Sequence, residues 1–121
     1  MRFAFLELTE SIFLVLFEAD NDSEPDWQIR DKILRYLKYY DQSGKLFRVL
    51  FVAANSERVR ELLRAARSSI PEEMHRMFLF ASRQDFGANS LGEICSLCHS
   101  DKRASLIPHY ADSGGVTGLL R

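Results

Sequence analysis

The segment from Ile12 to Asp20 constrains the fold of this chain more than any other. The run Ile12–Phe17 is apolar without interruption, and it leads into two carboxylates, Glu18 and Asp20, two residues apart. A strand that is apolar on both sides is typical of an interior, covered position in a sheet. Because side chains alternate along a strand, we expect Glu18 and Asp20 to point to the same side.

Further apolar runs and two amphipathic segments surround this strand. Helices are predicted where apolar residues recur every three or four positions, and strands where they are continuous. Helices of this length suit right-handed crossovers between parallel strands, whereas the first two strands are close enough for a hairpin. We therefore predict an α/β fold, a small mixed sheet in the order ββαβαβ with helices on its faces. The predicted strands are residues 3–7, 12–19, 47–54 and 77–81, and the predicted helices are 27–40 and 56–69.

The end of the chain has a weaker pattern. We predict a loop over residues 83–90 and a short helix over residues 91–98, which carries Cys95 and Cys98. We expect one α/β domain over residues 1–108 and a mobile C-terminal tail over residues 109–121.

Composition narrows the class of protein. Of 121 residues, 46% are hydrophobic and 27% are charged, which is ordinary for a globular domain. The longest apolar run is far shorter than the roughly 20 residues that span a bilayer, and no signal-peptide pattern is visible. We therefore expect a cytoplasmic protein with no membrane partner. The net charge of −1 excludes a global attraction to nucleic acid, so DNA binding requires a local patch.

Glu18, Asp20 and Lys32 are the candidate catalytic residues. Carboxylates at the carboxyl end of a strand are suited to Mg²⁺ or Mn²⁺, and a nearby lysine offsets charge on a phosphate. This combination indicates metal-assisted phosphodiester hydrolysis, with Lys32 reaching over the strand end from the border of the buried helix face. The alternative is a polar strand end in which Lys32 pairs with the carboxylates or with solvent.

Other polar and aromatic residues near this strand end have simpler interpretations. Asp22, Glu24 and Asp26 extend the acidic segment, but loop solubility and a favourable helix N-terminus explain them better than a metal does. Tyr36 and Tyr40 fall on the buried face of their helix, which favours core packing.

A local basic patch is the candidate DNA-binding site. Its side chains come from both predicted helices and from the segment between them, and together they suit a phosphate backbone. Glu57 and Glu61 stand three residues before Arg60 and Arg64, so a self-neutralised, ion-paired face is the favoured alternative. The patch consists of Arg35, Lys38, Lys45, Arg48, Arg60, Arg64 and Arg67.

Three other kinds of site are disfavoured. Cys95-Ser-Leu-Cys98-His99 matches the haem-attachment string, but no second cysteine pair completes a zinc site, and we expect buried structural cysteines and no haem. No glycine lies where a strand opens into a helix, so we expect no nucleotide cofactor. A phosphorylated receiver domain is disfavoured because the strand ending at Asn55 lacks an acceptor aspartate.

The order of these motifs resembles the replication-relaxation proteins of bacterial plasmids, phages and mobile elements. The resemblance covers about residues 3–82, through the segments 17–24 and 47–52, the pair Lys32-Ile33 and the tyrosines of the first helix. It implies a restriction-endonuclease-like core similar to the PD-(D/E)XK nucleases. In that pattern Glu18 is the metal-binding acid of the hairpin, Asp20 stands at the usual lysine position, and Lys32 is a substitute lysine.

The family pattern also places a Pro-Asp at the first strand, and this sequence has none there. Glu7 is the only acid of that strand and would be the third metal ligand. Two functions stay open. The first is a nuclease-like domain of a mobile-element protein acting in DNA replication or DNA binding, either as a metal-dependent DNA phosphodiesterase or as a catalytically degenerate relative. The second is a non-catalytic module for a protein partner or a homodimer, with the first hairpin as its surface.

Overall fold

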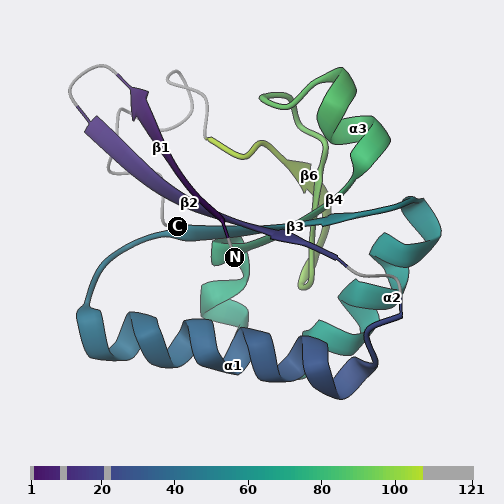
Figure 1. The fold of residues 1–121 in the computed structure, drawn as a ribbon, viewed down its shortest axis with the longest axis horizontal. Coiled ribbons are helices and arrows are strands. Elements are labelled where there is room, and N and C mark those ends of the chain that lie inside the picture. The colour runs from purple at the N-terminus through teal and green to yellow at the C-terminus, as the bar shows by residue number, and fades with distance from the viewer. Residues whose placement is uncertain (1, 9–10, 21–22, 108–121) are drawn as a thin grey trace.

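A computed structural model describes residues 2–8, 11–20 and 23–107 of the chain, with side chains from Leu14 onward. Six strands and three α-helices alternate along it, with one 3₁₀ turn before the fourth strand (Figure 1). The strands are β1 (Arg2–Leu8), β2 (Ser11–Ala19), β3 (Arg48–Ala53), β4 (Phe78–Ser82), β5 (Cys95–Leu97) and β6 (Ser100–Ala104); the helices are α1 (Asp26–Ser43), α2 (Ser56–Arg67) and α3 (Arg83–Ala88), and the 3₁₀ turn is η1 (Glu72–Met77).

The strands lie side by side in the same order as in the sequence, β1 to β6. β2, β3 and β4 are parallel, whereas β1 pairs antiparallel with β2, and β5 and β6 continue the far edge antiparallel. The predicted mixed α/β sheet and its ββαβαβ order are confirmed, and β2 is interior as expected. Its carboxyl end therefore lies beside those of β3 and β4, the edge where open α/β sheets place their sites.

Each face of the sheet has its own cover. α1 and α2 lie together against one face, and α3 lies against the other (Figure 1). Leu16, Phe51 and Phe80 belong to the core on the α1–α2 side. Val15 and Leu50 belong to the core on the α3 side. The strict alternation of buried residues between the two cores explains why the strand sequences are apolar at nearly every position.

Local signals set the ends of the two long helices. Asn55 caps α2, because its side-chain oxygen accepts a hydrogen bond from the Arg58 amide at 2.8 Å. Gly44 ends α1 with φ of 66°, and its amide donates to the Tyr40 carbonyl. Only glycine adopts this left-handed conformation without a Cβ penalty, so Gly44 sets the end of the helix.

Two predictions for the last third were wrong. Residues 83–88 form α3 rather than a loop, because the Ser82 hydroxyl caps the first turn by accepting from the Asp85 amide. Cys95 and Cys98 were expected on a short helix, but residues 95–97 form β5. The predicted tail over 109–121 lies outside the described residues.

Both cysteines are buried, as expected, and neither forms a disulfide; they face opposite sides of the sheet. Cys95 lies in the α3-side core, and Cys98 lies in the α1–α2 core, where its thiol is 3.8 Å from the Leu63 carbonyl. Of the helices in the described ranges, none combines the length and the apolar character that a membrane span requires.

Candidate functional site

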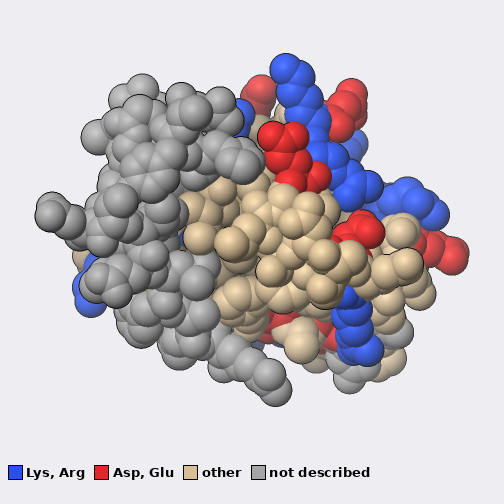
Figure 2. All heavy atoms as spheres, turned by 90° about the horizontal axis from the view of Figure 1, so that it is seen from above, with Lys and Arg blue, Asp and Glu red and all other residues tan. Residues whose placement is uncertain are grey.

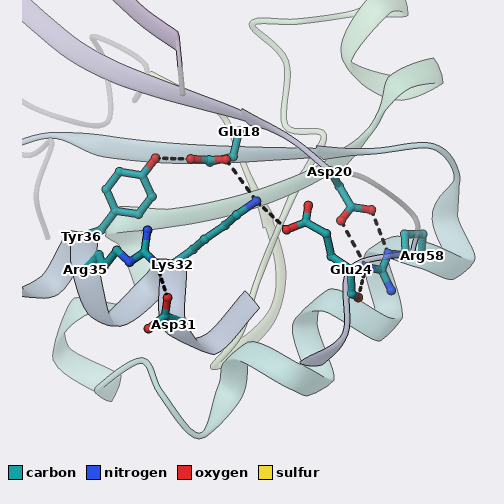
Figure 3. Close-up of polar contacts among 8 residues, drawn as sticks. All are labelled: Glu18, Asp20, Glu24, Asp31, Lys32, Arg35, Tyr36 and Arg58. Atoms are coloured by element: carbon teal, nitrogen blue, oxygen red, sulfur yellow. Dashed lines mark hydrogen bonds and ion pairs between the residues drawn. The ribbon is translucent and has the colours of Figure 1, made fainter. Parts of the chain in front are cut away.

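Glu18, Lys32 and Tyr36 meet where β2 crosses α1 (Figure 3). The phenol of Tyr36 donates to Oε1 of Glu18 across 2.5 Å, and Nζ of Lys32 lies 3.5 Å from Oε2 of the same carboxylate. Glu18 is only 8% exposed, and Tyr36 is 4% exposed. The approach of Lys32 to Glu18 over the strand end agrees with the sequence-based prediction.

A second carboxylate holds Lys32 from the other side. Oε2 of Glu24 lies 2.7 Å from Nζ of Lys32, and Figure 3 shows the ammonium between Glu18 and Glu24. Glu24 precedes α1, so the contact ties the loop after β2 to the helix that follows it. Lys32 thereby bridges two partly or fully buried acids that would otherwise repel each other.

Asp20 has a different partner, the buried guanidinium of Arg58 from α2. Nε and Nη2 of Arg58 donate to the two oxygens of Asp20, at 2.8 and 3.2 Å. Nη2 also donates to the Glu24 carbonyl at 3.0 Å. Such a forked pair is the strongest geometry for an arginine and a carboxylate. Arg58 therefore fixes both Asp20 and the loop that carries Glu24.

Burial and these contacts shift two pKa values upward. Burial raises the pKa of Tyr36, and the hydrogen bond to Glu18 and its negative charge add to the rise. For Lys32, burial works to lower the pKa, but the hydrogen bond to Glu24 and the charges of both glutamates outweigh it, so the pKa is raised. Lys32 is thus a fixed cation at this site.

The acids at this strand end do not form a ready site for Mg²⁺ or Mn²⁺. Both oxygens of Glu18 and both of Asp20 contact hydrogen-bond donors or cations. Within the part of the chain that the structure describes, no group of three acidic, histidine or cysteine residues is placed to hold a metal ion. A divalent ion would have to displace Lys32 or Arg58, whose charges already compensate the carboxylates.

Glu7 is not near these acids. It pairs with Ile12 in the hairpin, six residues before Glu18 on β2, whereas Arg2 is the β1 residue opposite Phe17. At about 3.3 Å per residue this separates the Glu7 and Glu18 backbones by roughly 20 Å, too far for one metal ion to join them.

The residues of the predicted basic patch divide into three groups. Lys38 and Lys45 are exposed, and Arg35 is exposed but paired with Asp31. Arg48 is buried on the other side of the sheet, where its Nη1 donates to the carbonyls of Ser105 and Leu106, so it does not belong to an exposed patch.

The third group lies along α2. Arg60, Arg64 and Arg67 are exposed, and Nε of Arg67 donates to the Cys98 carbonyl. The ion pairs expected from Glu57 to Arg60 and from Glu61 to Arg64 are not formed; that prediction was wrong. Among the described residues, neither Arg60 nor Arg64 has an ion pair or side-chain hydrogen bond. Here we call Arg60, Arg64 and Arg67 the α2 arginine stripe.

The opposite side of the molecule has a different charge pattern. Figure 2 views it from above, and there Lys and Arg side chains are interspersed with Asp and Glu side chains on one side of an uncharged area. Where opposite charges are interspersed in this way, their fields largely cancel beyond about 10 Å.

Sequence reasoning named Glu18, Asp20 and Lys32 but missed the residues that complete the site. Tyr36 was assigned to the core, and its ring is there, but its hydroxyl points to Glu18. Arg58 was not singled out. The available signal was its position three residues after the cap Asn55, on the buried side of α2 next to Val59 and Leu62, where an arginine requires an acidic partner.

Comparison of the chain with models of protein families, with curated proteins and with solved structures finds no match.

Proposed function

We propose that this chain is a nuclease-like α/β domain of a mobile-element protein that binds DNA during replication and does not cleave it. The observation that carries the proposal is a contrast in charge compensation. The acids at the end of β2 each have an internal cationic partner. Arg60 and Arg64, on the outer side of α2, have no acidic partner among the described residues.

The α2 arginine stripe supports the DNA-binding part. Its residues are spaced at i, i+4 and i+7, so they follow one side of the helix, where a phosphate backbone can contact them in succession. Lys38 on neighbouring α1 is exposed and adds charge to the same layer. Arginine without an internal carboxylate keeps its full hydrogen-bonding capacity for phosphate oxygens.

The Glu18–Lys32–Glu24 arrangement supports the non-cleaving part. The strand end carries an acid and a lysine, the residue types that the resemblance to replication-relaxation proteins implies for a nuclease-like site. Lys32 and Arg58, however, supply the positive charge that a metal ion would supply in an active enzyme. The arrangement thus favours a stable, charge-balanced strand end over a metal-binding one.

The experiment is incubation of supercoiled plasmid with the protein across a panel that includes Mg²⁺ and Mn²⁺, followed by electrophoresis before and after protein removal. We expect retardation of the plasmid that disappears on protein removal, with the plasmid still supercoiled.

The R60Q/R64Q double variant should retard the plasmid less. R76Q, an equal charge change per site on exposed η1, should behave as wild type. Nicked or linear plasmid that is not produced by an E18Q variant would overturn the non-cleaving part. Absence of retardation at low salt would overturn the DNA-binding part.

A second candidate function is a protein-interaction module, and one observation favours it. Trp27 and Leu34 stand seven residues apart on α1 and are 61% and 54% exposed. Two large apolar side chains on the same exposed side of a helix are typical of a contact surface. Size-exclusion chromatography tests the homodimer form of this function. A dimer that dissociates in a W27A/L34A double variant supports it, and a monomer over the accessible concentration range contradicts it.

A further inference from the structure

A small cleft opens at the carboxyl end of β4, away from the Glu18 site. α2, α3, β5 and β6 surround it, and its floor is apolar, formed by residues such as Val59, Leu63 and Phe80. Its rim is polar, with hydroxyls from three serines and with Arg60, Arg103 and Asp85. This is the edge of a parallel sheet at which α/β proteins bind ligands.

Size restricts the ligand. The cleft has a volume of about 70 Å³. That is less than half of the roughly 150 Å³ of an engineered cavity that binds benzene. The enclosed part of the cleft is therefore too small for a nucleobase or a sugar ring, and its size suits a single tetrahedral anionic group.

Charge restricts the ligand further. Arg103 is already shared, because its Nη1 lies 3.6 Å from Oδ2 of Asp85 and donates to the Ile94 carbonyl at 3.0 Å. Arg60 has no ion pair or hydrogen bond among the described residues, so the rim carries one uncompensated positive charge. The serines Ser56, Ser82 and Ser96 provide neutral hydrogen-bonding groups around it.

We propose that this cleft is a binding site for a phosphate group, held by Arg60 and Arg103 with the serine hydroxyls. The phosphate replaces Asp85 as the partner of Arg103. Arg60 then neutralises the part of the phosphate's negative charge that Arg103 does not. A phosphodiester of a nucleic-acid backbone and the phosphate of a small phosphorylated molecule share this chemistry. The site does not depend on DNA binding by the rest of the α2 arginine stripe.

The test is a titration with inorganic phosphate at constant ionic strength, followed by amide chemical shifts of the folded full chain. We expect saturable shifts at Ser56, Ser82 and their neighbours. R60Q and R103Q should each weaken binding about tenfold, because each removes one charged hydrogen-bonding partner. D85N should tighten binding, because it removes the competing carboxylate. R76Q, an exposed arginine on η1 at the opposite end of β4, is the matched control and should leave the dissociation constant unchanged.

R103Q also removes the hydrogen bond to the Ile94 carbonyl. R103K keeps the positive charge at this position, so comparing phosphate binding by R103K and R103Q separates loss of charge from loss of local structure. The proposal is overturned if shifts are unsaturable, if R76Q weakens binding as much as R60Q does, or if D85N weakens it. Repeating the titration with a nucleoside monophosphate and with a short DNA duplex identifies the source of the phosphate. Phosphate binding that survives in a protein that fails to bind DNA supports this site while contradicting the proposed function.

Discussion

The phenol of Tyr36 donates to Oε1 of Glu18 across 2.5 Å, joining the interior strand β2 to α1 inside the core. This bond and the Lys32 contact compensate a carboxylate that is 8% exposed. A buried charge without such partners costs several kcal/mol. The Tyr36 hydroxyl therefore stabilises the buried Glu18 carboxylate, whatever the strand end binds.

Replacing Tyr36 with phenylalanine should lower the free energy of unfolding by about 2 kcal/mol. The ring packing survives, but Glu18 loses a hydrogen bond in a place that water does not reach easily. Tyr39→Phe is the control, because Tyr39 is 43% exposed and its hydroxyl makes no hydrogen bond among the described residues. Urea denaturation of both variants measures the effect, and an equal decrease in the two would contradict it.

The raised pKa of Tyr36 predicts a specific sensitivity to alkali. The folded state holds the phenolic proton more tightly than the unfolded state, in which the pKa is near 10. The resulting stabilisation is therefore complete below pH 10 and is lost as the pH rises above it. Lys32, whose pKa is also raised, contributes with the same sign.

Denaturation of wild type and Y36F at several pH values checks this sensitivity. The stability advantage of wild type over Y36F should shrink as the pH passes above about 10. A constant advantage across that range would show that the phenol ionises with the same pKa in the folded and unfolded states.

Breaking the pair of Asp20 and Arg58 should destabilise the fold more than any single exposed charge change. Asp20→Asn leaves a guanidinium that is 8% exposed without its forked carboxylate partner. Removal of one member of a buried pair typically costs about 3–5 kcal/mol. Glu57→Gln, an exposed change one residue away on α2, should stay within about 0.5 kcal/mol of wild type. Thermal or urea unfolding distinguishes the two, and a decrease below about 1 kcal/mol for Asp20→Asn would refute the role of the pair.

The two cysteines should be unreactive in the native protein. Burial raises the pKa of Cys95 to about 11 and that of Cys98 to about 11. At about pH 8 almost no thiolate is present in the fold, and only the thiolate reacts with an aromatic disulfide reagent. Both thiols should react once urea unfolds the chain. Rapid reaction of either one under native conditions would mean that the β5 region opens readily.

The central fold was predictable because its signals are local. The apolar runs of β2, β3 and β4 and the periodicity of α1 and α2 each follow from a few consecutive residues. The β5–β6 segment was not predictable in this way. Cys95 and Leu97 alternate over only three residues, and their burial depends on the α3-side core that forms in the complete sheet. The cap at Ser82 was visible, but so short a helix has almost no periodicity.

The site was predictable only in part, for a related reason. Glu18 and Lys32 belong to neighbouring elements, so strand alternation and helix phase were sufficient to bring them together. Arg58 comes from the second helix, 38 residues after Asp20, and its partner depends on how α2 packs beside α1. Whether the arginines of α2 pair with their own glutamates depends on side-chain rotamers, which spacing alone does not determine.

The salt dependence of duplex DNA binding by wild type and the R60Q/R64Q variant, measured by fluorescence anisotropy, directly tests whether the α2 arginine stripe contacts DNA. Wild-type affinity should fall steeply as the salt concentration rises. The double variant should bind more weakly, with a slope smaller by about 2, because each substitution removes one arginine that neutralises a phosphate. Equal affinities and slopes for the two proteins, or no binding by wild type at low salt, would contradict that contact.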